Sequence, residues 1–158
     1  MPRKEAAAGE KVLASNRQAF HNFFIDERFE AGLVLLGTEV KSLRQGKANL
    51  KEAYARVDRG QVYLHNCHIS QYSHGGYANH EPLRTRKLLL HKGEILRLAQ
   101  KTAGGGNTIV PLRLYLSKGK VKAEIALARG KNLWDKREAI RKRDHEREVR
   151  SAAAREDD

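Results

Sequence analysis

Apolar residues occupy every second position from Val110 to Leu116 and again from Val121 to Leu127, with the turn Lys118-Gly119 between the two runs. Alternation with a period of two is typical of a β-strand that buries one face. The pattern therefore predicts a long antiparallel hairpin, in which Pro111 lies near a strand start or on an edge.

Other segments predict shorter strands. Residues 54–57 and 61–65 flank Asp58-Arg59-Gly60, which is the pattern of a β-hairpin. The Phe-rich residues 20–29 predict a core-forming strand, or a pair of strands, bent near Asp26-Glu27. Residues 31–36 predict a buried strand, whereas the sequence barely constrains residues 66–82.

Two short helices complete the expected body. One spans Glu39–Gln45 with Thr38 as its N-cap, and the other runs from Lys92 to about Thr102 and ends before Gly104. Many short strands with small helices favour a closed or partly open β-barrel. We expect three regions: a flexible arm (1–14), the barrel (15–130) and a charged tail (131–158).

The tail lacks the apolar stripe that packs a helix onto its own domain. It carries nine Lys or Arg and eight Asp or Glu, and its sizeable apolar residues are Leu133, Trp134, Ile140 and Val149. We expect it to be disordered alone and to order against a large polar partner. The alternative is a solvated tail without a function.

Charge points to a polyanionic partner for the body. The 158-residue chain has a net charge of +12, and because the tail contributes nine minus eight, the other residues carry +11. Nucleic acid is the first candidate and an anionic membrane the second. The longest aliphatic run, residues 33–36, is far shorter than the roughly 20 residues of a membrane span. With no apolar signal region and a single Cys67, we expect a cytoplasmic protein.

Catalytic chemistry is weakly indicated. His65, Cys67 and His68 are metal-ligand types, but they have no second cluster at zinc spacing. His21 with Glu30 could form the acid–base pair of a nuclease, yet no acidic metal cluster accompanies them. We therefore expect no catalytic residue, no metal and no cofactor.

Basic residues are better organised, and they suit phosphate contacts with base stacking nearby. No DNA-reading motif is present, so RNA recognised by shape is favoured over DNA. A merely solvated basic surface is the plain alternative. The basic residues group in three segments: Lys41, Arg44, Lys47 and Lys51; Arg84, Arg86, Lys87 and Lys92; and Lys118, Lys120, Lys122, Arg129 and Lys131.

Four motifs resemble the SmpB family, whose members bind transfer-messenger RNA (tmRNA). They occur in the family's order over about residues 15–150: Asn16-Arg17 with His21 and Phe24-Ile25; Gly37-Thr38-Glu39-Val40-Lys41-Ser42-Leu43-Arg44 with Gly46-Lys47-Ala48-Asn49; residues 84–90; and Ala128-Arg129-Gly130-Lys131 leading to Asp135-Lys136-Arg137. The resemblance implies an oligonucleotide-binding-type antiparallel β-barrel with two or three short helices and a C-terminal tail that is disordered alone.

The resemblance also implies a function, the rescue of stalled bacterial ribosomes by trans-translation. The protein would bind the transfer-RNA-like domain of tmRNA, deliver it to the vacant A site and replace the missing anticodon arm. Its tail would fold as a helix in the empty messenger channel, against 16S ribosomal RNA at the decoding centre. Elongation factor Tu and alanyl-tRNA synthetase would be indirect partners, and the protein itself would not be an enzyme.

Site residues follow from the matched motifs. The resemblance implies RNA contacts by Asn16, His21, Glu30, Leu89 and Lys120, to which Arg17, Lys41 and Arg44 are added on charge. Leu89 would offer a platform for an unstacked base, and Glu30 would accept hydrogen bonds from base or ribose groups, or else pair with a lysine. The expected tail contacts with the ribosome are Arg129, Lys131, Trp134, Asp135, Lys136, Arg137, Lys142 and Arg143.

Departures from the family pattern occur at Phe20, Asn22 and Asn132. Two rival interpretations stay open: a generic ribosomal protein or RNA chaperone on a barrel, and a ribonuclease.

Overall fold

The computed structural model describes residues 10–131. Its helices are α1 (Arg17–Asn22), α2 (Gly37–Arg44) and α3 (Lys92–Thr102), with a 3₁₀ turn, η1 (Gly76–Ala78). The strands are β1 (Glu10–Ser15), β2 (Phe23–Leu33), β3 (Ala48–Asn49), β4 (Tyr54–Asp58), β5 (Gln61–His65), β6 (His68–Ile69), β7 (Arg86–Leu89), β8 (Thr108–Ser117) and β9 (Lys120–Gly130).

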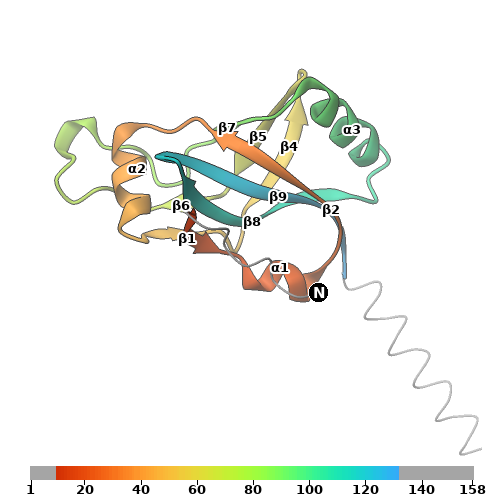
Figure 1. The fold of residues 1–158 in the computed structure, drawn as a ribbon, viewed down its shortest axis with the longest axis horizontal. Coiled ribbons are helices and arrows are strands. Elements are labelled where there is room, and N and C mark those ends of the chain that lie inside the picture. The colour runs from red at the N-terminus through yellow and green to blue at the C-terminus, as the bar shows by residue number, and fades with distance from the viewer. Residues whose placement is uncertain (1–9, 132–158) are drawn as a thin grey trace, which may run out of the picture.

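The strands close into an antiparallel barrel (Figure 1). The ring runs β8-β4-β5-β7-β2-β9 and returns to β8, while β1 pairs with residues 113–117 of β8 and β3 pairs with β6. The predicted fold class, a mainly β antiparallel barrel with two or three short helices, is confirmed.

One core fills the barrel, built from alternate residues of the ring strands, such as Val62 and Leu64 on β5 and Ile125 on β9. Leu43 of α2 and Leu98 of α3 are fully buried against it. Helix α3 and both predicted hairpins are confirmed. Each hairpin turns through two residues of positive φ, Arg59-Gly60 and Lys118-Gly119, whose twist matches that of the flanking strands.

A β-bulge at Leu112 makes part of the predicted alternation wrong. The pairing shifts between Pro111 and Arg113, so Leu114 faces the barrel core whereas Val110 and Leu112 face outward beneath α1. Pro111 is tolerated inside β8, away from a strand start, because it lies beside this bulge. A second bulge, between Ile25 and Glu27, confirms the predicted bend in β2.

Four expected boundaries are wrong. Residues 10–14, expected in a flexible arm, pair with β8 as β1, where Leu13 is buried. Residues 17–22 form α1 ahead of the Phe-rich strand, because the Asn16 side chain caps the Ala19 amide. Strand β2 ends at Leu33, not at residue 36. Helix α2 is capped at Leu36 N by the Glu39 carboxylate (2.8 Å), while Thr38 bonds elsewhere.

Candidate nucleic-acid interface

An apolar hollow of about 300 Å³ lies on the outer wall where β7, β2 and β9 meet α2. Leu89 and Lys120, which are far apart in sequence, both line it, and Val40 of α2 forms part of its side. Leu89 is 52% exposed, whereas its neighbour Leu88 is fully buried in the core. Leu89 is therefore an exposed apolar side chain on the barrel wall, as an apolar platform would require.

The platform depends on a glycine. Gly32 pairs with Leu89 on one side and with Lys122 on the other, so it lies between them on the wall. A Cβ atom at Gly32 would lie 3.2 Å from the Leu89 Cβ, closer than side chains normally pack. Absence of a side chain at Gly32 thus leaves Leu89 room to lie over the strand.

Glu30 joins the same wall through Lys122. The Lys122 ammonium donates to the Glu30 carboxylate at 2.6 Å, and Lys122 also lines the hollow. Burial and a hydrogen bond to Glu30 raise the pKa of the Tyr115 hydroxyl above its ordinary value. The lysine pairing that the sequence left as an alternative for Glu30 is present, and 54% of the Glu30 side chain still faces solvent.

Most cations of the β8–β9–β2 wall are neutralised by neighbouring carboxylates. Glu124 pairs with Arg28 (3.2 Å) and with Arg113 (2.9 Å), and Arg113 reaches back to Glu10 of β1 (3.2 Å). By contrast, no ion pair within residues 10–131 involves Lys120, Lys41, Arg44, Lys47, Arg56 or Lys87. Positive charge without an ion-pair partner is therefore present beside the hollow, on α2, on β4 and on β7, among other places.

Helix α2 is locked to β7 by a buried cluster that joins two of the sequence motifs. The Glu39 carboxylate accepts from Arg86 Nε (2.5 Å) and from Arg84 (2.6 Å), and both Glu39 and Arg86 are fully buried. Burial alone would raise the pKa of Glu39, but hydrogen bonds from Arg84, the Leu36 amide and Arg86 outweigh it and hold that pKa below its ordinary value. Neither the spacing nor the charge pattern of the sequence predicts this cluster.

The ion pairs of Glu39 with Arg84 and Arg86 hold α2 in one orientation, and so determine which of its side chains face outward. Lys41 and Arg44 are exposed on it, as expected for residues that contact phosphates. The two arginines of the third motif, Arg84 and Arg86, instead bond to Glu39, and Arg86 also donates to the carbonyls of Cys67 and Pro82. These two guanidinium groups are therefore structural.

Helix α1 carries three expected RNA contacts but lies at the opposite end of β2. From Phe23 to Gly32 is nine steps along the strand, or about 30 Å. Arg17 and His21 are exposed there, whereas Asn16 is buried. Its amide donates to the carbonyls of Leu50 (3.2 Å) and Pro111 (2.9 Å).

The prediction that Asn16 contacts RNA at the surface is therefore replaced: its side chain positions neighbouring segments of the chain. Both amide hydrogens and the side-chain oxygen are used inside the protein, so the side chain holds α1 and the loop after β3 against β8. The sequence alone could have indicated this role, since Asn is a preferred N-cap residue.

The tail leaves the barrel beside α1. Lys131 N donates to the Asn22 carbonyl (2.7 Å), and the Lys131 ammonium lies 4.8 Å from the centre of the Phe24 ring. Arg129 pairs with Asp26 at 3.0 Å. The remaining expected tail contacts lie outside the described residues: Trp134, Asp135, Lys136, Arg137, Lys142 and Arg143, together with Asn132.

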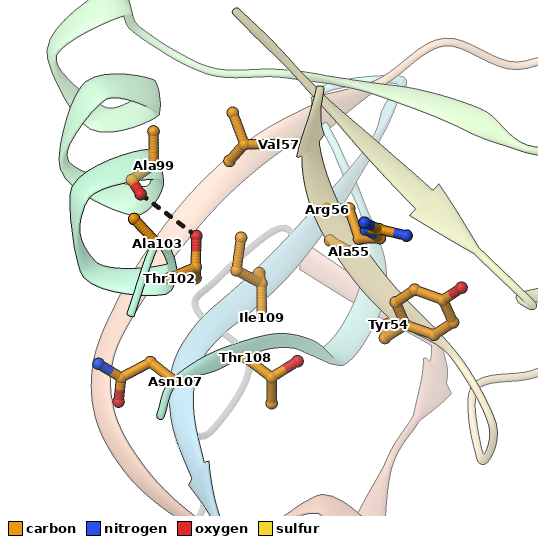
Figure 2. A pocket seen from close by; sticks show the side chains of 10 residues that line it. All are labelled: Tyr54, Ala55, Arg56, Val57, Ala99, Thr102, Ala103, Asn107, Thr108 and Ile109. Carbon is orange, nitrogen blue, oxygen red and sulfur yellow. Dashed lines mark hydrogen bonds between the residues drawn. The ribbon is translucent and has the colours of Figure 1, made fainter. Parts of the chain in front are cut away.

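A second hollow, of about 480 Å³, opens where β4 and β8 part (Figure 2). Only Ala55 and Ile109 pair across this seam. Figure 2 shows Ala99 and Thr102 of α3, and Ala103 directly after the helix, along one side. Because the lining contains no carboxylate, histidine or cysteine, this hollow offers no acid–base pair.

The residues of metal-ligand type, His65, Cys67 and His68, do not converge on a common site. His65 stacks on Tyr54 with ring centres 5.2 Å apart, and His68 is exposed on β6. Cys67 is fully buried, and this burial raises the pKa of its thiol to about 11. Within residues 10–131 no group of three His, Cys, Asp or Glu is placed to hold a metal. Nor does that part of the chain contain a helix long and apolar enough to cross a membrane.

Known proteins resemble the chain along nearly its whole length. The family model described as "SmpB protein" matches residues 13–155. The "SsrA-binding protein" of Syntrophobacter fumaroxidans is 55% identical over 151 residues, which cover 94% of each chain. That of Nocardia farcinica is 57% identical over 141 residues, covering 89% of this chain and 88% of the relative.

A solved structure is also similar to this chain. It is described as "tmRNA-SmpB: a journey to the center of the bacterial ribosome" and superposes with a TM-score of 0.66 at 47% identity. The match covers 81% of this chain and 94% of the solved one.

Proposed function

Since the chain belongs to the SmpB family, we propose that it binds the transfer-RNA-like domain of tmRNA and brings it to the A site of stalled ribosomes for trans-translation. Relatives that share more than half of its residues are named for binding SsrA RNA, which is tmRNA. The description of the similar solved structure names tmRNA and the bacterial ribosome.

The observation that carries the proposal is the wall around the Leu89 hollow. It combines an exposed apolar platform, an unpaired Lys120 and a half-exposed carboxylate at Glu30. An apolar platform suits an unstacked base, lysine suits phosphate, and a carboxylate suits base amino or ribose hydroxyl groups. The unpaired Lys41 and Arg44 extend the positive surface along α2.

This proposal is tested by comparing the affinity for the transfer-RNA-like domain with that for an ordinary RNA hairpin of equal length, at several salt concentrations. Shape-specific recognition predicts tighter binding of the transfer-RNA-like domain at every salt concentration. Equal affinities with equal salt slopes would mean that the chain only neutralises phosphates, as a generic RNA chaperone would. RNA cleavage by the purified chain would favour a ribonuclease.

The tail is proposed to act separately from the barrel. Residues 131–158 would order as a helix in the empty messenger channel, with Trp134 stacking on a ribosomal base and Asp135, Lys136 and Arg137 at the decoding centre. Arg129, Lys131, Lys142 and Arg143 would contact ribosomal RNA phosphates. The support is the family membership and the tail's mixture of basic and acidic residues without an apolar stripe.

Removing 131–158 tests this division of labour. RNA affinity should stay near that of the full chain, while tagging of stalled nascent chains is abolished. Trp134→Ala should impair tagging more than it impairs RNA affinity. If truncation removed RNA binding together with tagging, the tail and the barrel would form one binding unit.

The remaining expectations belong to the same proposal. The protein acts in the cytoplasm as a binding factor and not as an enzyme, and it meets elongation factor Tu and alanyl-tRNA synthetase only through the RNA they share.

A further inference from the structure

The loop between β6 and β7 projects beyond α2 and ends in an unpacked tyrosine. Figure 1 shows the loop, around residues 70–83, standing clear of the barrel next to α2. Tyr77, on the short turn η1, has a relative exposure of 111%, the largest among the exposed large hydrophobic residues of the described chain. A fully exposed ring contributes little to folding and is available for contact with a partner.

Hydrogen bonds hold the two sides of this loop together. Asn79 Nδ2 donates to the Tyr72 carbonyl (2.6 Å), and the Tyr72 amide donates to Asn79 Oδ1 (3.0 Å). Below this clamp, Gln71 donates to the His80 carbonyl (3.0 Å). The His80 ring is buried between Thr38 Oγ1 and the Ile69 carbonyl, each 2.9 Å away. The loop therefore rises from a fixed base.

Two glycines allow the tip to form. A Cβ atom at Gly75 would lie 2.8 Å from the Asn79 side chain, so a larger residue would break the clamp. Gly76 has a φ of +53°, in the left-handed region that favours glycine. Tyr77 is thus presented by a loop whose shape is set before any partner binds, which lowers the entropic cost of binding.

The surroundings of the loop favour a polyanion. The Lys41 ammonium lies 5.3 Å from the centre of the Tyr72 ring, and the Ser70 amide donates to the Lys47 carbonyl (3.0 Å), so α2 and its following turn touch the loop's base. Lys41, Arg44 and Lys47 are exposed and make no ion pair with residues 10–131. An exposed ring, on a loop whose base contacts a helix that carries unpaired cations, suits the binding of unstacked nucleotides.

We propose that Tyr77 stacks on an unpaired base of an RNA whose phosphates lie along Lys41, Arg44 and Lys47. This deepens the proposed function, since it adds a contact on the far side of α2 from the Leu89 hollow. The base belongs either to tmRNA or to ribosomal RNA, and two binding measurements distinguish these sources.

The test uses the full chain with Tyr77→Ala and Tyr77→Phe. Affinity is measured for the free transfer-RNA-like domain and, separately, for stalled ribosomes. Loss of one base stack lowers affinity about 5- to 150-fold. Tyr77→Ala should show that loss in one of the two measurements, and Tyr77→Phe, which keeps the ring, should stay within about threefold of wild type. Leu96→Ala, at a 59%-exposed leucine on α3, is the matched control and should change neither affinity.

Three results would overturn the stacking role. The first is wild-type affinity of Tyr77→Ala in both measurements. The second is an equal loss for Tyr77→Phe, which would assign the contact to the hydroxyl. The third is a photo-crosslink from a benzophenone side chain at position 77 to a protein instead of RNA. Failure of the wild-type chain to bind either RNA would instead contradict the proposed function, so the two failures are distinguishable.

Discussion

Replacing Glu39 with glutamine should sharply lower the stability of the barrel. Glu39 and Arg86 are both fully buried and joined at 2.5 Å, and Arg84 adds a contact of 2.6 Å. Glutamine keeps the shape of the side chain but removes the charge, so Arg86 becomes a buried cation without a counter-ion. Breaking a buried pair in this way costs about 3–5 kcal/mol.

This loss is a large part of the total, because domains of this size unfold with about 5–15 kcal/mol. The assay is urea denaturation followed by circular dichroism. At a slope of about 2 kcal/mol per molar urea, the midpoint should fall by about 2 M. Glu27→Gln is the control, because Glu27 pairs with Arg97 at the surface and should cost less than about 1 kcal/mol.

The double variant Glu39→Gln/Arg86→Met should lose less than the sum of the two single variants, because it removes both charges. The pH dependence has a definite sign. The pKa of Glu39 is held below its ordinary value of 4.5 in the folded state, so its contribution is present above pH 4.5 and is lost as pH falls through the folded-state pKa. The single variant should lose less stability over that acidic window. A Glu39→Gln cost below about 1 kcal/mol, or strict additivity with Arg86→Met, would refute this reasoning.

Three further predictions concern Leu89, Asn16 and Cys67. Leu89→Ala should weaken binding of the transfer-RNA-like domain about fivefold. Full burial of a leucine contributes about 1.5–3 kcal/mol, and because half of this side chain is still exposed, the RNA can gain about 1 kcal/mol by covering it. An unchanged titration curve would contradict the platform role of Leu89. Asn16→Ala should cost about 1–3 kcal/mol in urea denaturation, because the Leu50 and Pro111 carbonyls lose a donor and α1 loses its cap; a neutral result would contradict the positioning role. Burial raises the pKa of Cys67 to about 11, so its thiol should resist iodoacetamide at pH 8 until urea is added, whereas rapid labelling of the native protein would contradict its burial.

Local sequence patterns predicted the elements whose signals are local. The two hairpins and α3 follow from alternation, turn glycines and helical periodicity over a few residues, and the closed barrel agrees with them. The outward-facing side chains of Val110 and Leu112 on β8 could not be predicted, because the bulge at Leu112 becomes visible only through the pairing of β8 with β9. Strand β1 was missed for a similar reason: its alternation is weak, and it is held by pairing with residues about a hundred positions later.

The candidate site divides in the same way. Family motifs predicted RNA contacts at Leu89, Lys120 and Glu30, which the fold brings to one wall. The same motifs did not separate surface contacts from internal ones. Asn16 is fully bonded inside the protein, and Arg86 looks like one more basic residue of its segment until Glu39, 47 positions earlier, is found beside it. Burial of a polar side chain depends on tertiary contacts that neither charge nor spacing reveals.

The most direct test of the account is tagging of nascent chains on stalled ribosomes, in a reconstituted system that contains tmRNA and lacks any other member of the family. Adding the purified full chain should restore tagging, and omitting either tmRNA or the chain should abolish it. Absence of tagging by a chain that binds the transfer-RNA-like domain tightly would contradict the proposed role in trans-translation.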